Sequence, residues 1–67
     1  MRMVNELGQA IYYNDVMKRG QLRFVVKAAS GQFILGRDRE KLRSRTFAQE
    51  HQAEAWLRRN GYHVEGI

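Results

Sequence analysis

The stretch Thr46–Gly61, TFAQEHQAEAWLRRNG, decides the fold because it predicts one helix together with both of its ends. Thr46 can accept a hydrogen bond from the free amides of a first helical turn. Gln49, three residues later, can reach back to Thr46 as in a capping box. Gly61 supplies the left-handed residue that commonly ends a helix. The sequence therefore predicts a helix that begins after Thr46 and stops at Gly61.

One side of this helix is apolar. At about 100° per residue, Ala53, Trp56 and Leu57 fall on one stripe. Glu54 and Arg58 lie mostly on the other side, in the favourable i, i+4 order. We therefore expect a surface helix that packs Trp56 and Leu57 against the rest of the chain.

Upstream of the helix the pattern changes to the alternation that is typical of strands. Residues 21–29 (QLRFVVKAA) alternate between apolar and mainly basic positions, which predicts a strand. Ser30-Gly31 predicts a tight hairpin, with residues 32–36 (QFILG) as the returning strand. A charged turn leads to residues 41–45 (KLRSR), a third and shorter strand. The predicted core is Leu22, Phe24, Val26, Phe33, Leu35, Leu42, Phe47, Trp56, Leu57 and Val64.

Two segments leave alternatives open. Residues 1–20 can form a helix, because Asn5 can cap its start and Gly20 can end it. They can also form a strand over Gln9–Tyr13 followed by a turn at Asn14-Asp15. Paired end signals slightly favour the helix. At the other end, residues 62–64 add an edge strand or pack under the helix.

These elements predict an α+β domain spanning residues 1–67. Its expected architecture is a small three-stranded antiparallel meander packed against a C-terminal helix. A chain this short buries only about 60% of its unfolded surface. It has no cysteine for disulfides and no Cys/His cluster for zinc. Homodimer formation is therefore a reasonable hypothesis, because a dimer buries surface that the monomer leaves exposed.

Charge is the unusual bulk property of this chain. Twelve Lys and Arg against seven acidic residues give a formal net charge of +5 and a pI near 10.3. Most of the cations are Arg, which forms forked contacts with phosphate. A pI above 9 is typical of nucleic-acid binders, although such a charge also promotes solubility. Without a membrane-length apolar run, a signal peptide or cysteine, we expect a cytoplasmic protein that does not bind membranes.

The cations also form a pattern. Over residues 37–45 they recur at every second position, and in a strand over residues 41–45 they share the face opposite Leu42. Arg23 and Lys27 lie on the non-core face of the strand before. This block of charge suits a phosphate backbone, although charges also protect an edge strand from aggregation. The predicted nucleic-acid-binding residues are Arg23, Lys27, Arg37, Arg39, Lys41, Arg43 and Arg45.

Catalysis has little support in the sequence. The candidate nucleophiles are Ser30 and Ser44, and no nucleophile motif surrounds either serine. The histidines that would act as bases, His51 and His63, are twelve residues apart without a third ligand, which is also too little for a metal site. Glu50 and Glu54 share a face of the predicted helix and could form a catalytic carboxylate pair, but a solvated helix surface explains them without catalysis. We therefore expect a non-enzymatic protein without cofactor or metal.

Residues 21–61 resemble a group of small DNA-binding domains. Three strands, Phe47 at the strand–helix junction, Glu54-Ala55-Trp56-Leu57 and Gly61 are similar to the N-terminal domains of phage and transposon integrases, which are related in shape to AP2 domains. The resemblance implies a sheet that enters the major groove. It also implies DNA contacts at Arg23, Lys27, Lys41, Arg43 and Arg45.

The order α-β-β-β-α of a double-stranded-RNA-binding domain fits the helical interpretation of residues 1–20. However, that family begins its second helix with a lysine cluster, and this chain has Ala48-Gln49-Glu50-His51 there. The first hypothesis is therefore a small duplex-DNA-binding protein. The alternative is a protein-binding inhibitor or adaptor, of the kind that phages and mobile elements encode, which docks an acidic partner surface.

Overall fold

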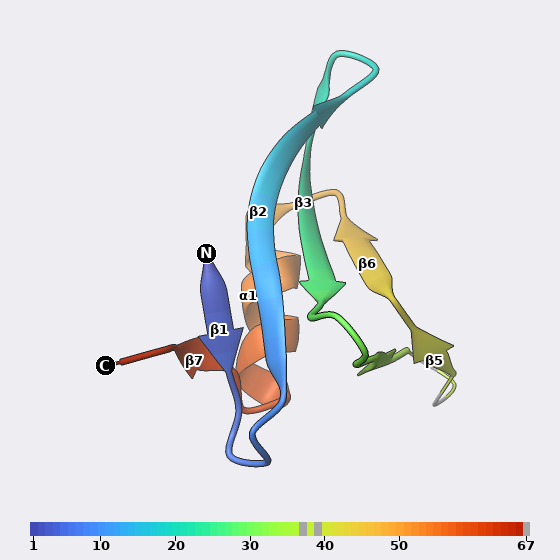
Figure 1. Ribbon diagram of the computed structural model, residues 1–67. Coiled ribbons are helices and arrows are strands. Elements are labelled where there is room, and N and C mark those ends of the chain that lie inside the picture. Colours follow the sequence, from blue (N-terminus) through green and yellow to red (C-terminus); the bar gives the residue numbers. More distant parts are fainter. Residues whose placement is uncertain (37, 39, 67) are drawn as a thin grey trace.

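The computed structural model describes residues 1–36, 38 and 40–66 and confirms the α+β class. Five antiparallel strands form one sheet in the order β6-β3-β2-β1-β7, and a C-terminal helix covers one side of it (Figure 1). A separate two-stranded sheet pairs β4 with β5. The elements are β1 (Arg2–Val4), β2 (Ala10–Lys18), β3 (Gln21–Ala28), β4 (Ile34–Leu35), β5 (Lys41–Leu42), β6 (Ser44–Phe47), α1 (Glu50–Arg59) and β7 (His63–Val64).

The N-terminal segment forms strands, so the slightly favoured helix was wrong. Asn5 does not cap a helix; its Oδ1 accepts hydrogen bonds from the amides of Leu7 and Gln9, both at 3.0 Å, and closes the β1–β2 loop. Asn side chains commonly bond the backbone two residues on, which competes with helix formation. The β-favouring run Ile11–Tyr13 then decides in favour of a strand.

A hairpin with the two-residue turn Arg19-Gly20 joins β2 to β3. Both residues have positive φ, 52° and 76°. This is the geometry of a two-residue turn that matches the twist of the flanking strands. Asn14-Asp15, the turn of the alternative strand prediction, lies inside β2 and pairs with Val25 and Phe24.

The hairpin predicted at Ser30-Gly31 was wrong. A turn does occur there, with the Gln32 amide donating to the Ala29 carbonyl oxygen at 2.9 Å, but β3 pairs with β6. The following residues instead form the β4–β5 pair, in which the Gly36 amide donates to the Glu40 carbonyl oxygen at 2.8 Å. Tertiary pairing therefore overrides the local turn signal.

The predicted strand over residues 41–45 is divided at Arg43. Lys41 and Leu42 belong to β5, and Ser44 and Arg45 belong to β6. Since the two pieces join different sheets, the alternation of side chains does not continue across Arg43. The expectation that the three cations of this segment share one face was therefore wrong.

The helix begins later than predicted and ends where predicted. Thr46 belongs to β6 and pairs with Val25 of β3. The N-cap is Gln49, and its side chain makes no capping hydrogen bond. At the other end Gly61 has φ 74°, and its amide donates to the Arg58 carbonyl oxygen at 3.1 Å. The Tyr62 amide donates to the Leu57 carbonyl oxygen at 3.0 Å, which completes a Schellman motif.

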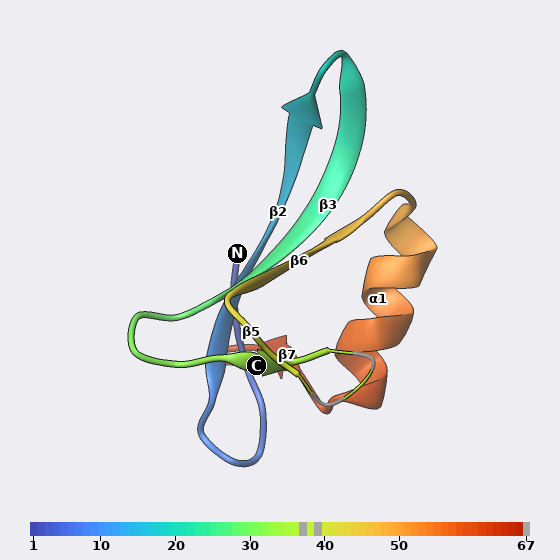
Figure 2. The same ribbon diagram turned by 90° about the vertical axis from the view of Figure 1, so that its right-hand side faces the viewer.

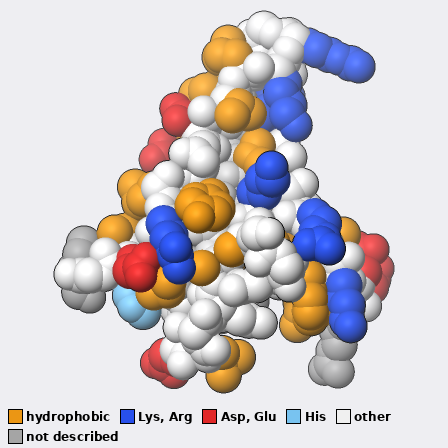
Figure 3. All heavy atoms as spheres, in the orientation of Figure 1, with side chains coloured by type: hydrophobic (Ala, Val, Ile, Leu, Met, Phe, Trp, Pro, Cys, Tyr) orange, Lys and Arg blue, Asp and Glu red, His pale blue; other side chains and the backbone are white. Residues whose placement is uncertain are grey.

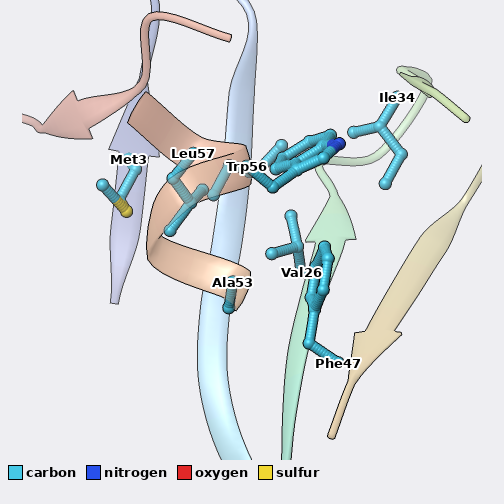
Figure 4. Close-up of a cluster of buried hydrophobic side chains, with 8 residues drawn as sticks. Met3, Val26, Ile34, Phe47, Ala53, Trp56 and Leu57 are labelled. Carbon is cyan, nitrogen blue, oxygen red and sulfur yellow. The ribbon is translucent and has the colours of Figure 1, made fainter. Parts of the chain in front are cut away.

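The core lies between the sheet and α1 (Figure 4). Trp56 lies between the helix and Ile34, stacks on Tyr62 at 5.7 Å between ring centroids, and contacts Phe47 at 6.2 Å. Val64 packs against this cluster from the edge strand β7. The buried residues are Met3, Ala10, Ile11, Val26, Ile34, Phe47, Ala53, Trp56 and Leu57.

Three residues predicted for the core are instead exposed: Leu22, Phe33 and Leu35. Leu22 lies near the end of the β2–β3 hairpin, beyond the helix. In the segment after the turn the buried residue is Ile34, so the predicted alternation was out of phase by one residue. A shift of one residue moves every side chain of a strand to its other face.

Candidate nucleic-acid interface

The large sheet has two unlike sides, because α1 packs on only one of them (Figure 2). The side that packs on α1 is called the helix side, and the other side is called the open face. Strand alternation and the pairing register place the side chains of Tyr12, Lys27 and Ser44 in one row across the open face. The rows toward the hairpin turn hold Asn14, Val25 and Thr46, then Val16 and Arg23, then Lys18 and Gln21.

The open face is cationic. Lys18, Arg23 and Lys27 lie on it, and so does Arg2, which forms an ion pair with Glu65 at 2.8 Å. Among the described residues of the five strands there is one acidic residue, Asp15, and it points to the helix side. The Lys and Arg side chains can be followed in Figure 3 from the end of the hairpin along one half of this face. Their charge is therefore not neutralised by acids on the same strands.

A hollow of about 770 Å³ lies on the open face. Its apolar lining includes Val16 and Val25, and Tyr12 lines it together with Lys27. Tyr12 is 41% exposed, whereas its neighbour Tyr13 turns to the helix side. The hollow therefore combines an apolar lining, one aromatic ring and cations at its border.

The structure separates the cations that the sequence grouped. Arg23 and Lys27 lie on the open face as predicted. Arg43 borders the same hollow, and its guanidinium donates to the Gln32 carbonyl oxygen at 3.1 Å. The Arg23 guanidinium donates to the Leu22 carbonyl oxygen at 3.0 Å and to Gln21 Oε1.

The remaining predicted residues are elsewhere. Arg45 lies on the helix side, where its guanidinium carbon is 5.0 Å from the centroid of the Phe47 ring. The Lys41 ammonium is 4.9 Å from the centroid of the Phe33 ring, at the two-stranded sheet. Arg37 and Arg39 are outside the described residues. Of the seven predicted cations, Arg23, Lys27 and Arg43 are thus brought together.

Sequence reasoning missed Lys18, Arg2 and Tyr12 as members of this face. The signal for Tyr12 and Lys18 was present in the alternation of Ala10–Lys18, but the slight preference for a helix over residues 1–20 concealed it. Once β2 is a strand, Tyr12 and Lys18 fall at its even positions, on the same face as Asn14 and Val16.

Acidic groups gather on the helix side instead. Burial raises the pKa of the Tyr13 hydroxyl, and the carboxylates of Glu50, Glu54 and Asp15 raise it further. This hydroxyl is buried and has no hydrogen-bond partner among the described residues. The carboxylates of Asp15, Glu50 and Glu54 therefore lie on the side of the sheet that α1 covers.

The candidate catalytic residues come from four parts of the chain: Ser30 follows β3, Ser44 is in β6, His51 is in α1 and His63 is in β7. Ser30 borders the hollow, and the residues that line it include neither His51 nor His63. His51 lies on α1 beside Arg45, and His63 is on β7 at the sheet edge. Within residues 1–36, 38 and 40–66 no group of three or more His, Cys, Asp and Glu side chains is arranged to hold a metal ion.

Comparisons with protein-family models, with curated proteins and with solved structures gave no match to this chain. The resemblance to integrase N-terminal domains therefore stays a prediction. No helix in the described part of the chain is long and apolar enough to cross a membrane.

Proposed function

We propose that this chain is a small nucleic-acid-binding protein that holds the phosphate backbone of duplex DNA against its open face. The observation that carries the proposal is the charge of this face. Lys18, Arg23 and Lys27 lie on it, Arg43 borders its hollow, and its described strand residues include no acid. Such a surface attracts phosphates and releases their counterions on binding.

The dimensions of the face favour backbone contacts over insertion of the whole sheet. The strands that carry the named open-face residues are β6, β3, β2 and β1. At about 4.8 Å spacing these four strands span about 14 Å, more than the major-groove width of about 12 Å. Along β3, Arg23 and Lys27 are four residues apart, or about 13 Å. We therefore expect contacts with several phosphates and little readout of base sequence.

Single strands are the less favoured nucleic-acid ligand. Their binding proteins stack successive bases on several aromatic rings. On the described strands of the open face the exposed aromatic residue is Tyr12 alone. One ring supports one stacked base, whereas the cations are spread over three rows of the sheet.

A second candidate function is docking of an acidic protein, as an inhibitor or adaptor. The apolar lining of the hollow, with Val16 and Val25, is the observation that favours it. Apolar side chains surrounded by cations suit an acidic segment that also carries apolar residues. We keep this function second because the charge extends well beyond the hollow, to Lys18 at the end of the hairpin.

The test is a fluorescence-anisotropy titration of a labelled DNA duplex at two salt concentrations, with an RNA duplex and a DNA single strand in parallel. We expect the DNA duplex to bind most tightly, with little effect of shuffling its sequence. With three to four phosphate contacts, the slope of log K against log salt should be about −3 to −4. Absence of binding at low salt would reject the proposal and direct the search to an acidic protein partner.

A further inference from the structure

The end of the β2–β3 hairpin carries an apolar surface on the helix side that the described chain leaves uncovered. β1 pairs with β2 only over Ala10–Tyr12, and β6 pairs with β3 only over Phe24–Lys27. The hairpin therefore extends past its neighbouring strands and past the start of α1 (Figure 2). Met17 and Leu22, which are paired across the hairpin, are 66% and 45% exposed.

The charges beside this apolar pair have opposite signs on its two sides. Asp15 precedes Met17 by two residues on the helix side of β2, and together with Leu22 and Glu50 it lines a second hollow, separate from that of the open face. Arg19 follows Met17 by two residues, in the exposed turn. Asp15 and Met17 are about 7 Å apart along β2, and Arg19 lies just past the end of this strand. The order along the hairpin is thus acid, apolar pair, cation.

We propose that this surface, the hairpin patch (Asp15, Met17, Arg19 and Leu22), binds the hairpin patch of a second copy of the chain. A two-fold axis through Met17 exchanges the positions two residues before it and two residues after it. It therefore brings Asp15 of one copy to Arg19 of the other copy, twice, while Met17 and Leu22 of both copies meet at the centre. A two-fold interface requires this kind of self-complementary surface.

The charge order is what selects a second copy as the occupant. A partner of uniform charge would match either Asp15 or Arg19 and oppose the other. The same chain, turned by 180°, matches both. Covering Met17 and Leu22 also removes apolar surface from water. This burial stabilises a domain that is too small to bury much surface by itself.

The size of the patch sets the expected strength of the dimer. It involves two short strand segments, so it is smaller than the roughly 1,200 Å² that delimits weak, transient interfaces. We expect reversible association with a dissociation constant on the order of 10⁻⁵–10⁻⁴ M. Contact through the helix sides leaves both open faces outward, so the inference does not rest on the proposed function.

The experiment is sedimentation equilibrium of the full chain from micromolar to millimolar concentration at moderate salt. The variants are Asp15→Arg and Arg19→Asp, measured separately and as an equimolar mixture. In a dimer of either variant alone, residues 15 and 19 carry the same charge at both contacts between the copies. The self-association of each variant should therefore weaken by about tenfold or more. The mixture restores both opposite-charge contacts and should associate within about threefold of the wild type.

This design separates the hairpin patch from general charge repulsion. Asp15→Arg raises the formal net charge of +5 by two, and Arg19→Asp lowers it by two. Repulsion between whole molecules would therefore make Arg19→Asp associate more tightly, whereas the hairpin patch predicts that both variants associate less. Aspartate also accepts the positive φ of 52° at position 19. Circular dichroism checks that each variant is folded.

The charge variants can overturn the inference in three ways. The wild-type chain could stay monomeric at millimolar concentration, Arg19→Asp could associate more tightly, or the mixture could associate no better than its components. A Met17→Thr variant, which keeps the strand propensity but removes the apolar contact, should also weaken association at least threefold. An unchanged dissociation constant in that variant would likewise place the contact elsewhere.

Discussion

Arg43 and Arg45 are two residues apart, yet their side chains meet different surroundings. The Arg43 guanidinium borders the open-face hollow, and the Arg45 guanidinium lies over the Phe47 ring on the helix side. The change of sheet at Arg43 is the cause of this difference. Replacing one arginine or the other therefore makes the same change of charge on either side of the sheet.

We expect Arg43→Ala to weaken duplex-DNA binding several-fold and to reduce the salt slope by about 1, because one phosphate contact is lost. Arg45→Ala is the matched control and should change affinity by less than about twofold. Anisotropy titrations of both variants at two salt concentrations make the comparison. Equal losses in the two variants would mean that net charge, rather than the open face, determines binding.

Tyr13 gives a second prediction at the scale of the residue. Its hydroxyl is buried without a partner among the described residues, which is an unfavourable state for a polar group. Tyr13→Phe should therefore raise the free energy of unfolding by about 1 kcal/mol at pH 7. Tyr12→Phe, which removes a hydroxyl from an exposed side chain, is the control and should change it by less than about 0.5 kcal/mol.

The pH dependence of the Tyr13 variant follows from the direction of the pKa shift. Burial raises the pKa of Tyr13 in the folded chain above its ordinary value of 10.0. Above that pH the unfolded chain loses the proton and the folded chain keeps it, so the wild type is destabilised. Urea unfolding at pH 7 and near pH 10.5 should show a larger advantage of Tyr13→Phe at the higher pH. A constant advantage would contradict the shift.

At the scale of the element, the Arg19-Gly20 turn sets the register of the β2–β3 hairpin. Gly20 has φ 76° and open space where a Cβ would lie, so the cost of a side chain there comes from the backbone alone. Gly20→Ala should lower the free energy of unfolding by about 1 kcal/mol. Arg19→Asn should have the opposite sign, since Asn tolerates positive φ better than Arg. Denaturant unfolding at low micromolar concentration avoids a contribution from self-association.

The elements also differ in how far the sequence predicts them. The end of α1 was predictable because Gly61 and the preceding turn form a local motif. The start of α1 was not, because Thr46 is held in β6 by pairing with Val25, a contact distant in sequence. The same reason explains the missed turn: Ser30-Gly31 carries a stronger local signal than Arg19-Gly20, but β3 finds its partner in β6.

In the candidate site, too, features set by local sequence were predictable and features set by distant contacts were not. Alternation within β3 correctly predicted that Arg23 and Lys27 share the non-core face. The position of Arg45 depended on where β5 ends and β6 begins, which no local pattern indicates. Tyr12 and Lys18 were concealed by the helical interpretation of residues 1–20.

At the scale of the whole molecule, one helix must cover the core of a five-stranded sheet. Trp56, 5% exposed, joins α1 to Phe47, Tyr62 and Ile34. Trp56→Ala should therefore cost about 3–5 kcal/mol, which is comparable to the whole stability of a domain this small. Thermal unfolding followed by circular dichroism should show a largely unfolded variant at 25 °C. A variant with an unchanged melting temperature would contradict the assigned core.

The division of the molecule into a cationic open face and a helix side with acidic groups is the basis of the proposed function. Its most direct test is an NMR titration of the isotope-labelled chain with a short DNA duplex, following the backbone amides and the Arg and Lys side chains. The open face predicts that the largest shifts fall on Tyr12, Arg23, Lys27 and Arg43, with small shifts on α1. Shifts concentrated on α1 or β7, or none at a duplex excess in low salt, would contradict the assignment of the open face as a phosphate-binding surface.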